Sequence, residues 1–480
     1  MKRLIYLFII LFHSWLYCYA ESGQRISVLD FGAIPDDGLD DSENIRKACE
    51  YCRDNKSTVL FFPPGLYNFR DSLALQIERE AISGVYGENV QGRLFKPDAP
   101  YVKALDLFGA ENLVVEAEGA ILLLEGWYEV VSIDKAREVT IKGLSIVYRR
   151  PPNSVGKITK LNEGSFDMQI DPERYFYLDK DVTGRVHYVD AMRERLYTGG
   201  RVSGKELLSK DMIRIYTDFR PSTGDFCVLR HSGHYRPAIM IKESSDIYIE
   251  GVKIHSQPGM GVVGHLSENI TLENLQVIPE AGMIISTNTD ATHFTSCKGE
   301  IVIENCKFGG QGDDCTNIHN YYYTIVPQTK RSVEIKIQNA DLHALSLDYP
   351  DVGDTLLVVN RSNLMEKEHF IVEQVDTSTV DWRVSVTLNK DWLIGSPDLY
   401  YMTNITRRPS VRITNNTVKS HLARAFLIKS RNVLINKNVV QNSTGTAIQL
   451  GAEAGWRESG PVENLSLIHI SEPTRLGMIS

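Results

Sequence analysis

A short pattern of alternating apolar and polar positions recurs along much of the chain. Each copy begins with a polar residue, places apolar residues at every second position, turns at Asn or Gly, and ends with further apolar residues. Alternation with a period of two is typical of a β-strand with one buried face. The copies, which are predicted strands, are 138–146, 246–254, 269–277, 301–306, 411–416 and 433–438.

The spacing of these copies indicates how the strands stack. Ile247 is followed by Ile270 after 23 residues, and Ile413 by Ile435 after 22. This period is that of one coil of a β-helix, in which each coil buries its apolar positions against its neighbours. Helical repeats do not alternate with a period of two, and a doubly wound α/β sheet would need amphipathic helices between the strands. We therefore predict an all-β chain folded as a right-handed parallel β-helix.

The segment before the repeats has a different pattern. A predicted strand at 26–33 leads into an acidic stretch, and a second buried strand follows at 59–62. This order resembles the N-terminal cap of pectin-lyase-like β-helices, in which a helix covers the open end of the coil stack. The predicted capping helix carries four apolar residues at helical spacing, Ile45, Ala48, Cys49 and Cys52.

Two stretches that interrupt the repeat, 155–236 and 325–408, are too long to be plain connections. Each contains a Gly-Asp turn followed by an apolar strand, so we predict two inserted small β-barrel-like domains.

The terminal string from Ser466 resembles a translated sequencing adapter, and we assign it no function. The predicted division is a signal at 1–20, N-terminal coils and cap at 21–154, inserts at 155–236 and 325–408, catalytic coils at 237–324, truncated C-terminal coils at 409–465, and an adapter-derived artefact at 466–480.

Composition and charge narrow the class of partner. Hydrophobic residues make up 42% and charged residues 24% of the 480 residues, as expected for a globular chain with a sizeable core. The formal net charge of −9 argues against a surface of clustered Lys and Arg that neutralises phosphates. We expect no nucleic-acid partner, and no sequence pattern indicates an oligomeric state.

The first twenty residues have the layout of a cleavable secretory signal: Lys2 and Arg3, an apolar run at 4–16, then Cys18-Tyr19-Ala20. We expect an exported protein, periplasmic, on the outer surface or secreted, without a transmembrane span; lipidation of Cys18 is the alternative. The remaining cysteines lack the spacing of a disulfide scaffold or a structural zinc site, and are predicted to be small buried apolar residues. They are Cys49, Cys52, Cys227, Cys297, Cys306 and Cys315.

The candidate chemistry lies in the polar run 310–319, which contains the adjacent carboxylates Asp313 and Asp314. Two carboxylates this close are difficult to ionise at the same time, and placing both among strands costs folding free energy. A function would explain why this cost is accepted. Asp290 precedes Asp313 by 23 residues, one coil period, and is therefore expected one rung away. Since rungs are about 4.8 Å apart, the three carboxylates are predicted to converge on one face.

Converging carboxylates suit glycoside hydrolysis. One carboxyl group must be protonated to donate to the leaving oxygen while another is ionised to activate water or attack carbon. Spacing in sequence does not distinguish inversion from retention. One alternative is that the Asp pair lies in a solvated turn, as isolated Asp pairs usually do and as we expect for Asp36-Asp37. Another is a Ca²⁺ site, which carboxylate oxygens would suit, although no calcium-loop motif is present. The coincidence with the coil period favours the catalytic interpretation.

Asn288-Thr289-Asp290 followed by Asp313-Asp314-Cys315 is similar to the active site of polygalacturonases, glycoside hydrolase family 28. The longer strings 289–294, 310–314 and 317–319, with two inserted β-domains, look like glycoside hydrolase family 110, the α-1,3-galactosidases of gut bacteria. This resemblance covers nearly the whole chain before Ser466. It implies an inverting exo-enzyme, without cofactor or metal, that acts on galactose-terminated oligosaccharides or glycoproteins such as the blood group B antigen. By this resemblance Asp313 is the general acid, and Asp290 and Asp314 position and deprotonate water.

Six further residues are candidates for substrate binding. His293 and His319 lie beside the aspartates and could hydrogen-bond sugar hydroxyls or tune a carboxylate. Asn317 alternates with His319 and is expected on the same face. Arg424 and the segment that contains Glu453 and Trp456 belong to later coils that could flank a cleft; Trp456 could stack on a sugar or be a core or cap residue. The full set is His293, Asn317, His319, Arg424, Glu453 and Trp456.

Three other functions are alternatives to the galactosidase. A pectin-type hydrolase would need basic residues for the uronate carboxylate, and no Arg-Ile-Lys string occurs, which favours a neutral galactoside. A catalytically inert β-helix that binds glycans would not depend on Asp313. Lyase chemistry would need an Arg or Lys base beside Ca²⁺, which the aspartate trio lacks.

Overall fold

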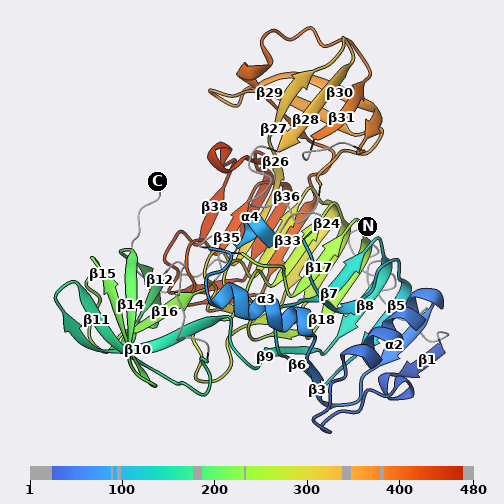
Figure 1. Ribbon diagram of the computed structural model, residues 1–480. Helices are drawn as coiled ribbons and strands as arrows, with labels where there is room; N and C mark the ends of the chain where they lie inside the picture. The colour runs from blue at the N-terminus through green and yellow to red at the C-terminus, as the bar shows by residue number, and fades with distance from the viewer. Residues whose placement is uncertain are drawn as a thin grey trace.

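The computed structural model describes residues 24–87, 90–94, 99–176, 186–231, 234–337, 347–378 and 383–468. Three parallel sheets form the body of the molecule, and consecutive strands pass from one sheet to the next, which confirms the predicted parallel β-helix (Figure 1). The predicted signal, with Cys18, lies outside the described residues, as does 469–480. Residues 466–468 belong to the last strand of the first sheet, three residues beyond the predicted end of the coils.

The strands of each sheet pair in the order in which the coils follow one another. The first sheet contains β1 (Gln24–Ser27), β2 (Thr58–Phe61), β5 (Glu111–Glu116), β8 (Arg137–Lys142), β18 (Ser245–Glu250), β21 (Glu268–Glu273), β24 (Lys298–Glu304), β33 (Ser410–Thr414), β36 (Arg431–Asn436) and β40 (Glu463–Ile468). The second contains β4 (Lys103–Asp106), β7 (Glu129–Asp134), β17 (Ile239–Lys242), β20 (Val262–His265), β23 (Thr292–Thr295), β26 (Thr316–Tyr321), β35 (Phe426–Ile428) and β38 (Ile448–Leu450). The third contains β3 (Gly65–Phe69), β6 (Ala120–Leu124), β9 (Ser145–Tyr148), β19 (Lys253–Ile254), β22 (Gln276–Val277), β25 (Lys307–Gly309), β34 (Thr417–Lys419) and β37 (Val439–Gln441).

The predicted coil period matches the observed pairing in the first sheet. Ile247 pairs with Ile270, and Ile413 with Ile435. The Asn or Gly of the repeat is also explained, because the residue after a strand of this sheet has φ between +54° and +74° at five successive levels. Gly, Asn and Asp adopt this left-handed conformation most readily. These turn residues are Gly143, Gly251, Asn274, Asn305 and Asn415.

A continuous apolar core fills the space between the three sheets. Inward-facing residues of adjacent coils, such as Ile249, Leu272 and Ile303, are fully buried and belong to one cluster that extends along the stack. All six cysteines of the described chain are buried and unpaired, which confirms their prediction as small core residues.

Buried asparagines stack at the corner between the first and third sheets. The Asn416 side chain accepts a hydrogen bond from the Cys306 backbone N–H at 2.8 Å and donates to the Ile303 carbonyl and to Asn438 Oδ1, both at 2.9 Å. Asn438 Oδ1 also accepts the Asn416 backbone N–H. Each amide therefore joins the backbones of adjacent coils.

Replacement of Asn416 by Ala should destabilise the β-helix, because it leaves the Cys306 N–H and the Ile303 carbonyl buried without these partners. An unsatisfied buried polar group costs about 1–3 kcal/mol, so we expect a loss of that order in the free energy of unfolding, measured by urea denaturation. Asn363→Ala is the control, since this asparagine is exposed and its backbone is not left-handed. An equal effect of both variants would contradict the role of the buried amide.

The N-terminal end of the stack is covered by α2 (Ser42–Asp54), and α3 (Ser72–Ile82) lies along the flank of the coils (Figure 1). The buried residues of α2 are the four predicted from helical spacing: Ile45, Ala48, Cys49 and Cys52. The capping helix is therefore confirmed. The short helices are α4 (Gln91–Leu94) and the 3₁₀ turns η2 (Val28–Phe31), η3 (Pro397–Leu399) and η4 (Ala454–Trp456).

Two antiparallel β units interrupt the coils, and they differ in closure. In the described residues, the strand order of the first unit runs from β13 to β14 without closing, whereas the second unit is a closed barrel. The first comprises β10 (Asn153–Asn162), β11 (Ser165–Ile170), β12 (Val186–Asp190), β13 (Arg195–Thr198), β14 (Val202–Ser209), β15 (Met212–Thr217) and β16 (Phe226–Arg230). The barrel comprises β27 (Tyr323–Pro327), β28 (Ser332–Ile337), β29 (Thr355–Asn360), β30 (Glu366–Asp376), β31 (Arg383–Leu388) and β32 (Tyr400–Asn404).

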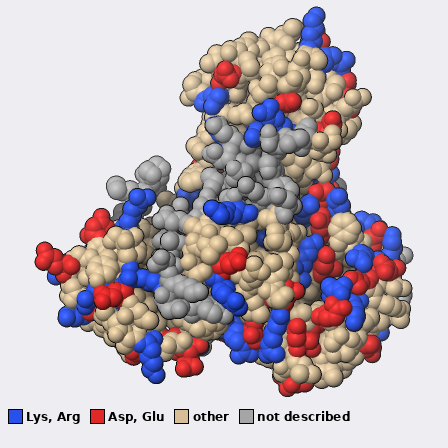
Figure 2. All heavy atoms as spheres, in the orientation of Figure 1, with Lys and Arg blue, Asp and Glu red and all other residues tan. Residues whose placement is uncertain are grey.

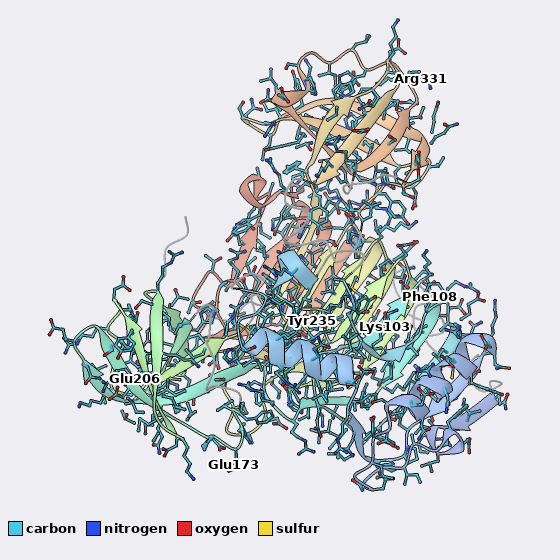
Figure 3. The ribbon with its side chains drawn as sticks, in the orientation of Figure 1. Lys103, Phe108, Glu173, Glu206, Tyr235 and Arg331 are labelled. Atoms are coloured by element: carbon cyan, nitrogen blue, oxygen red, sulfur yellow. The ribbon has the colours of Figure 1, made fainter. Side chains whose placement is uncertain are left out.

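The two units lie on different sides of the β-helix. Glu206 marks the first unit and Arg331 the barrel, at separate extremities of the molecule, and Tyr235 marks the body between them (Figure 3). On the face shown in Figure 2, Lys and Arg are interspersed with Asp and Glu rather than gathered in one basic patch. Among the described residues, none of the helices has the length and apolar character needed to span a bilayer.

Candidate active site

The three predicted aspartates lie at the start of adjacent strands of the second sheet. Asp290 precedes β23, and Asp313 and Asp314 precede β26. Thr292 pairs with Thr316, so this coil has 24 residues, and the Ala291 N–H donates to the Asp314 carbonyl at 3.1 Å. By this register Asp290 lies opposite Asp314 on the neighbouring coil. The prediction had placed it opposite Asp313 and was therefore wrong by one residue. The 23-residue coil length found between Ile247 and Ile270 does not hold for this coil.

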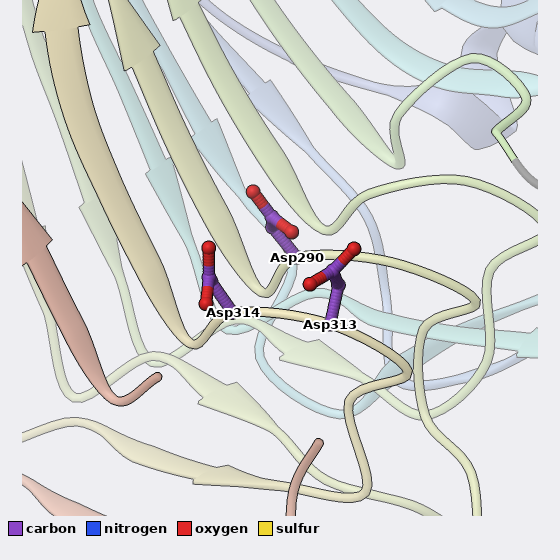
Figure 4. A group of neighbouring side chains, drawn as sticks. All are labelled: Asp290, Asp313 and Asp314. Atoms are coloured by element: carbon purple, nitrogen blue, oxygen red, sulfur yellow. The ribbon is translucent and has the colours of Figure 1, made fainter. Parts of the chain in front are cut away.

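The side chains nevertheless converge as predicted. One carboxylate oxygen from each of Asp290, Asp313 and Asp314 lies within 4.8 Å of the others (Figure 4). Asp290 and Asp314 are buried, whereas Asp313 is partly exposed. Two carboxyl groups are thus held within the protein, and the third can be reached from solvent.

Burial and mutual repulsion raise the pKa values in this trio. Burial, then the charges of Asp313 and Glu458, raise the pKa of Asp290 well above its usual range. Burial, followed by repulsion from Asp290 and Asp313, raises the pKa of Asp314 to about 8, although Arg424 opposes the shift. The trio therefore retains at least one proton near neutral pH, as coupled carboxyl groups do. A cluster that holds both a proton and a negative charge can perform acid–base chemistry.

Arg424 fixes the Asp314 carboxylate. Its backbone N–H donates to Asp314 Oδ1 and its Nη2 to Oδ2, both at 2.8 Å. Three carboxylate oxygens this close are also a donor set for a hard cation such as Ca²⁺. Because Arg424 already binds both oxygens of Asp314, the observed arrangement favours acid–base use over cation binding.

The predicted His293 and His319 form a buried hydrogen-bonded pair next to Asp290. His293 Nδ1 lies 2.7 Å from Asp290 Oδ2, and His293 Nε2 lies 3.0 Å from His319 Nε2. His319 Nδ1 donates to the Asn320 carbonyl at 2.8 Å. Both nitrogens of each ring are therefore engaged within the protein, which suits the tuning of a carboxylate better than contact with a sugar hydroxyl.

Asn317 is likewise engaged, in a buried network that sequence reasoning missed. Its amide donates to both oxygens of Glu458 at 3.3 Å, and Lys429 Nζ lies 2.5 Å from Glu458 Oε2. Lys429 is also 3.1 Å from Glu453. Burial raises the pKa of Glu458, but His319 and the Lys429 ammonium outweigh it and hold that pKa below its usual range.

The remaining predicted residues lie around this network. Glu453 is 3.6 Å from Arg424, and it precedes η4, which contains Trp456. The Trp456 side chain is 55% exposed. It is therefore not a core residue, and its predicted stacking on a sugar stays a prediction.

The first β unit also contacts the acid-bearing loops. Arg230, at the end of β16, donates to the Gly312 carbonyl at 3.1 Å, beside the Asp pair. Asn153, at the start of β10, donates to Asn288 Oδ1 at 3.3 Å. This unit thereby supports both loops that carry the trio, a role that its sequence pattern did not indicate.

Comparisons with known proteins agree with this chemistry. The sequence model of a family described as glycosyl hydrolases family 28 matches residues 225–341, which include the trio. The chain is 26% identical to alpha-1,3-galactosidase B of Bacteroides thetaiotaomicron over 92% of this chain and 74% of that protein. It is 24% identical to alpha-1,3-galactosidase A of Shewanella woodyi over 92% of this chain and 75% of that protein. A solved family 28 exopolygalacturonase of Yersinia enterocolitica is 10% identical, with a TM-score of 0.36, over 94% of this chain and 67% of that one. The similarity to the curated relatives confirms the resemblance found in the sequence.

Proposed function

We propose that this chain, a glycoside hydrolase homologous to bacterial α-1,3-galactosidases, is an inverting exo-α-1,3-galactosidase. Its proposed substrates are glycans that end in Gal-α-1,3-Gal, including the blood group B determinant. The observation that carries the proposal is the convergence of Asp290, Asp313 and Asp314 within 4.8 Å, with two of the three pKa values raised.

The differences in burial support the roles that the resemblance implies. Asp313, the partly exposed member, can reach the glycosidic oxygen, protonate it and release the leaving sugar. The buried Asp290 and Asp314 then orient a water molecule towards the anomeric carbon and accept its proton. Arg424 keeps Asp314 in place for this step through its two hydrogen bonds.

A neutral sugar fits the surrounding charges better than a uronate. Two cations near the trio are each bound to carboxylates: Arg424 to Asp314 and Glu453, and Lys429 to Glu458 and Glu453. Neither cation is therefore held for a substrate carboxylate. The family 28 match still makes a polygalacturonase-like hydrolase the second candidate.

Inversion of the anomeric centre is proposed from the family resemblance and not from the distances between the carboxylates. Single acid–base pairs of inverting enzymes are roughly 6.5–9.5 Å apart and those of retaining enzymes roughly 5–5.5 Å, whereas oxygens of this trio approach within 4.8 Å. Two of the three carboxyl groups are proposed to share the water, so the usual two-carboxylate rule does not apply directly. The first-formed anomer decides the question.

Release of galactose from Gal-α-1,3-Gal and from the fucosylated B trisaccharide is the direct test. We expect galactose from one or both, with β-galactose as the first anomer in the ¹H NMR spectrum. Polygalacturonate should yield no product in parallel assays. Hydrolysis of polygalacturonate without release of galactose would support the polygalacturonase-like hydrolase instead. Binding of the galactosides without turnover would identify an inert glycan-binding protein.

A further inference from the structure

A linear chain of buried hydrogen bonds leads from Asp290 into the body of the protein. It passes from Asp290 to His293, from His293 to His319, and ends at the Asn320 carbonyl, with heavy-atom distances of 2.7, 3.0 and 2.8 Å. All three side chains are buried, and the two imidazole planes are nearly perpendicular at 85°. No member of the chain is exposed, and only its Asp290 end lies beside the partly exposed Asp313.

The end of this chain fixes the direction of its bonds. A carbonyl oxygen only accepts, so His319 carries a proton on Nδ1. His319 is neutral, because burial lowers its pKa to about 3, and its Nε2 must accept from the Nε2–H of His293. His293 Nδ1 and Asp290 Oδ2 then share one remaining proton. Either Asp290 is a neutral acid that donates to a neutral His293, or Asp290 is ionised beside an imidazolium.

We propose that His293 is a positioning residue that takes the proton of Asp290 and thereby makes this buried carboxyl group available as an ionised base. In the transfer, the O–H bond at Asp290 Oδ2 breaks and an N–H bond forms at His293 Nδ1. The electron pair stays on the carboxylate, so the net charge of the pair is unchanged. This inference rests on the proposed function and adds to it a route by which Asp290 becomes ionised.

The resting position of the proton follows from the surroundings. Burial lowers the pKa of His293 to about 4, while that of Asp290 is raised well above its usual range, so the proton is on Asp290 at rest. Glu458 favours the imidazolium and Lys429 opposes it. The charged and titratable groups that face the pair are Asp313, Asp314 and Arg424 beside Asp290, and Glu458, Lys429 and Tyr321 beside the histidines.

The transfer matters because the raised pKa of Asp290 disfavours its ionisation by loss of the proton to water. With His293 present, an ionised Asp290 forms without loss of a proton from the pair, and it can then accept the proton of the attacking water. The pair is blocked only when it holds a second proton, which requires a pH near the His293 pKa of about 4. Without His293, Asp290 must lose its proton to solvent, and the fraction ionised increases only as pH rises through its raised pKa.

The bond directions can be tested without any activity. In ¹⁵N-histidine-labelled protein, with signals assigned through His293→Gln and His319→Gln, long-range ¹H–¹⁵N spectra report which ring nitrogens are protonated. We expect His319 protonated on Nδ1 alone and His293 protonated on Nε2. A neutral His293 protonated on Nδ1 alone would overturn the proposal, because that ring could not accept the Asp290 proton.

The kinetic test is the pH profile of kcat/KM for galactose release by His293→Gln. The Gln amide can still donate to His319 but cannot accept the Asp290 proton and hold it as a cation. We expect the loss of kcat/KM to be at least about tenfold greater at pH 5 than at pH 8, since the variant depends on ionisation by solvent. A loss equal at all pH values would overturn the proposal.

His265→Gln is the matched control. His265 is a buried histidine of β20 whose ring is bonded to Thr295 at 2.7 Å, and it does not contact the trio. Its variant should retain the wild-type pH profile. If the wild-type enzyme releases no galactose, the proposed function fails, whereas the NMR spectra still decide where the protons lie.

Discussion

Replacement of Asp313 by Asn is expected to lower kcat/KM for Gal-α-1,3-Gal by about 10²–10⁴-fold, the usual contribution of a positioned proton donor. The side chain is nearly unchanged in size, so the fold and the neighbouring carboxylates should be preserved. The amide cannot donate the proton that a sugar leaving group needs. Initial rates of galactose release, with the folded state checked by circular dichroism, provide the measurement.

The leaving group separates the role of Asp313 from those of its neighbours. Fluoride departs without a proton, so Asp313→Asn should lose much less activity on α-galactosyl fluoride than on Gal-α-1,3-Gal. Asp290→Asn, which impairs the use of water, should lose activity on both substrates. Asp37→Asn is the control, because Asp37 lies in an exposed turn. Equal losses on both substrates for Asp313→Asn would argue against the general-acid assignment.

Replacement of Lys429 by Met should produce the largest loss of stability. The ammonium is buried against Glu458 and Glu453, and its removal leaves Glu458 in the interior without its cation. Breaking one side of a buried ion pair typically costs about 3–5 kcal/mol. We expect a loss of this size in the free energy of unfolding, measured as a shift of the urea midpoint.

A second substitution tests the cause of that loss. In Lys429→Met/Glu458→Gln no charge is left unpaired between these two positions, so a substantial part of the stability should return. Lys390→Met removes a lysine that is paired with Glu368 at the surface and should leave the urea midpoint nearly unchanged. If the double variant is as unstable as Lys429→Met alone, the loss comes from packing and not from the unpaired carboxylate.

The coil stack and the acid trio were predictable because both depend on local repetition. The spacing of Ile247 and Ile270 gave the coil length, and the helical spacing of Ile45, Ala48 and Cys49 gave the cap. The position of Asp290 relative to the Asp pair was predicted to within one residue. The error arose because coils of 22, 23 and 24 residues occur in one chain, and the period found in one coil does not fix the next.

The supporting network was not predictable from the same pattern. Lys429 lies next to His319 only because β35 pairs with β26, and the residues of the barrel intervene between these strands in the sequence. Glu458 enters on β39 (Glu458–Ser459), an antiparallel strand that pairs with the end of β26 and has no counterpart in the repeat. Arg230 arrives from the other inserted unit. Contacts that cross an insertion leave no periodic trace in the sequence.

The order of strands in the second sheet determines how thermal opening of the outer coils reaches the acid trio. β23 and β26 are followed on one side by β35 and β38, and on the other by β20, β17, β7 and β4. In a one-dimensional stack, each coil is held chiefly by its immediate neighbours, and fraying starts at the outermost coils. An opening that begins at β38 or β4 must separate intervening rungs before it disturbs the loops of Asp290 and Asp313. The reaction centre is thus insulated from loosening that starts at β4, because β7, β17 and β20 lie between. On the other side only β35 separates β38 from β26, and Arg424 and Glu453 of those coils belong to the network that holds Asp314, so sequence drift there should disturb the alignment of the acids.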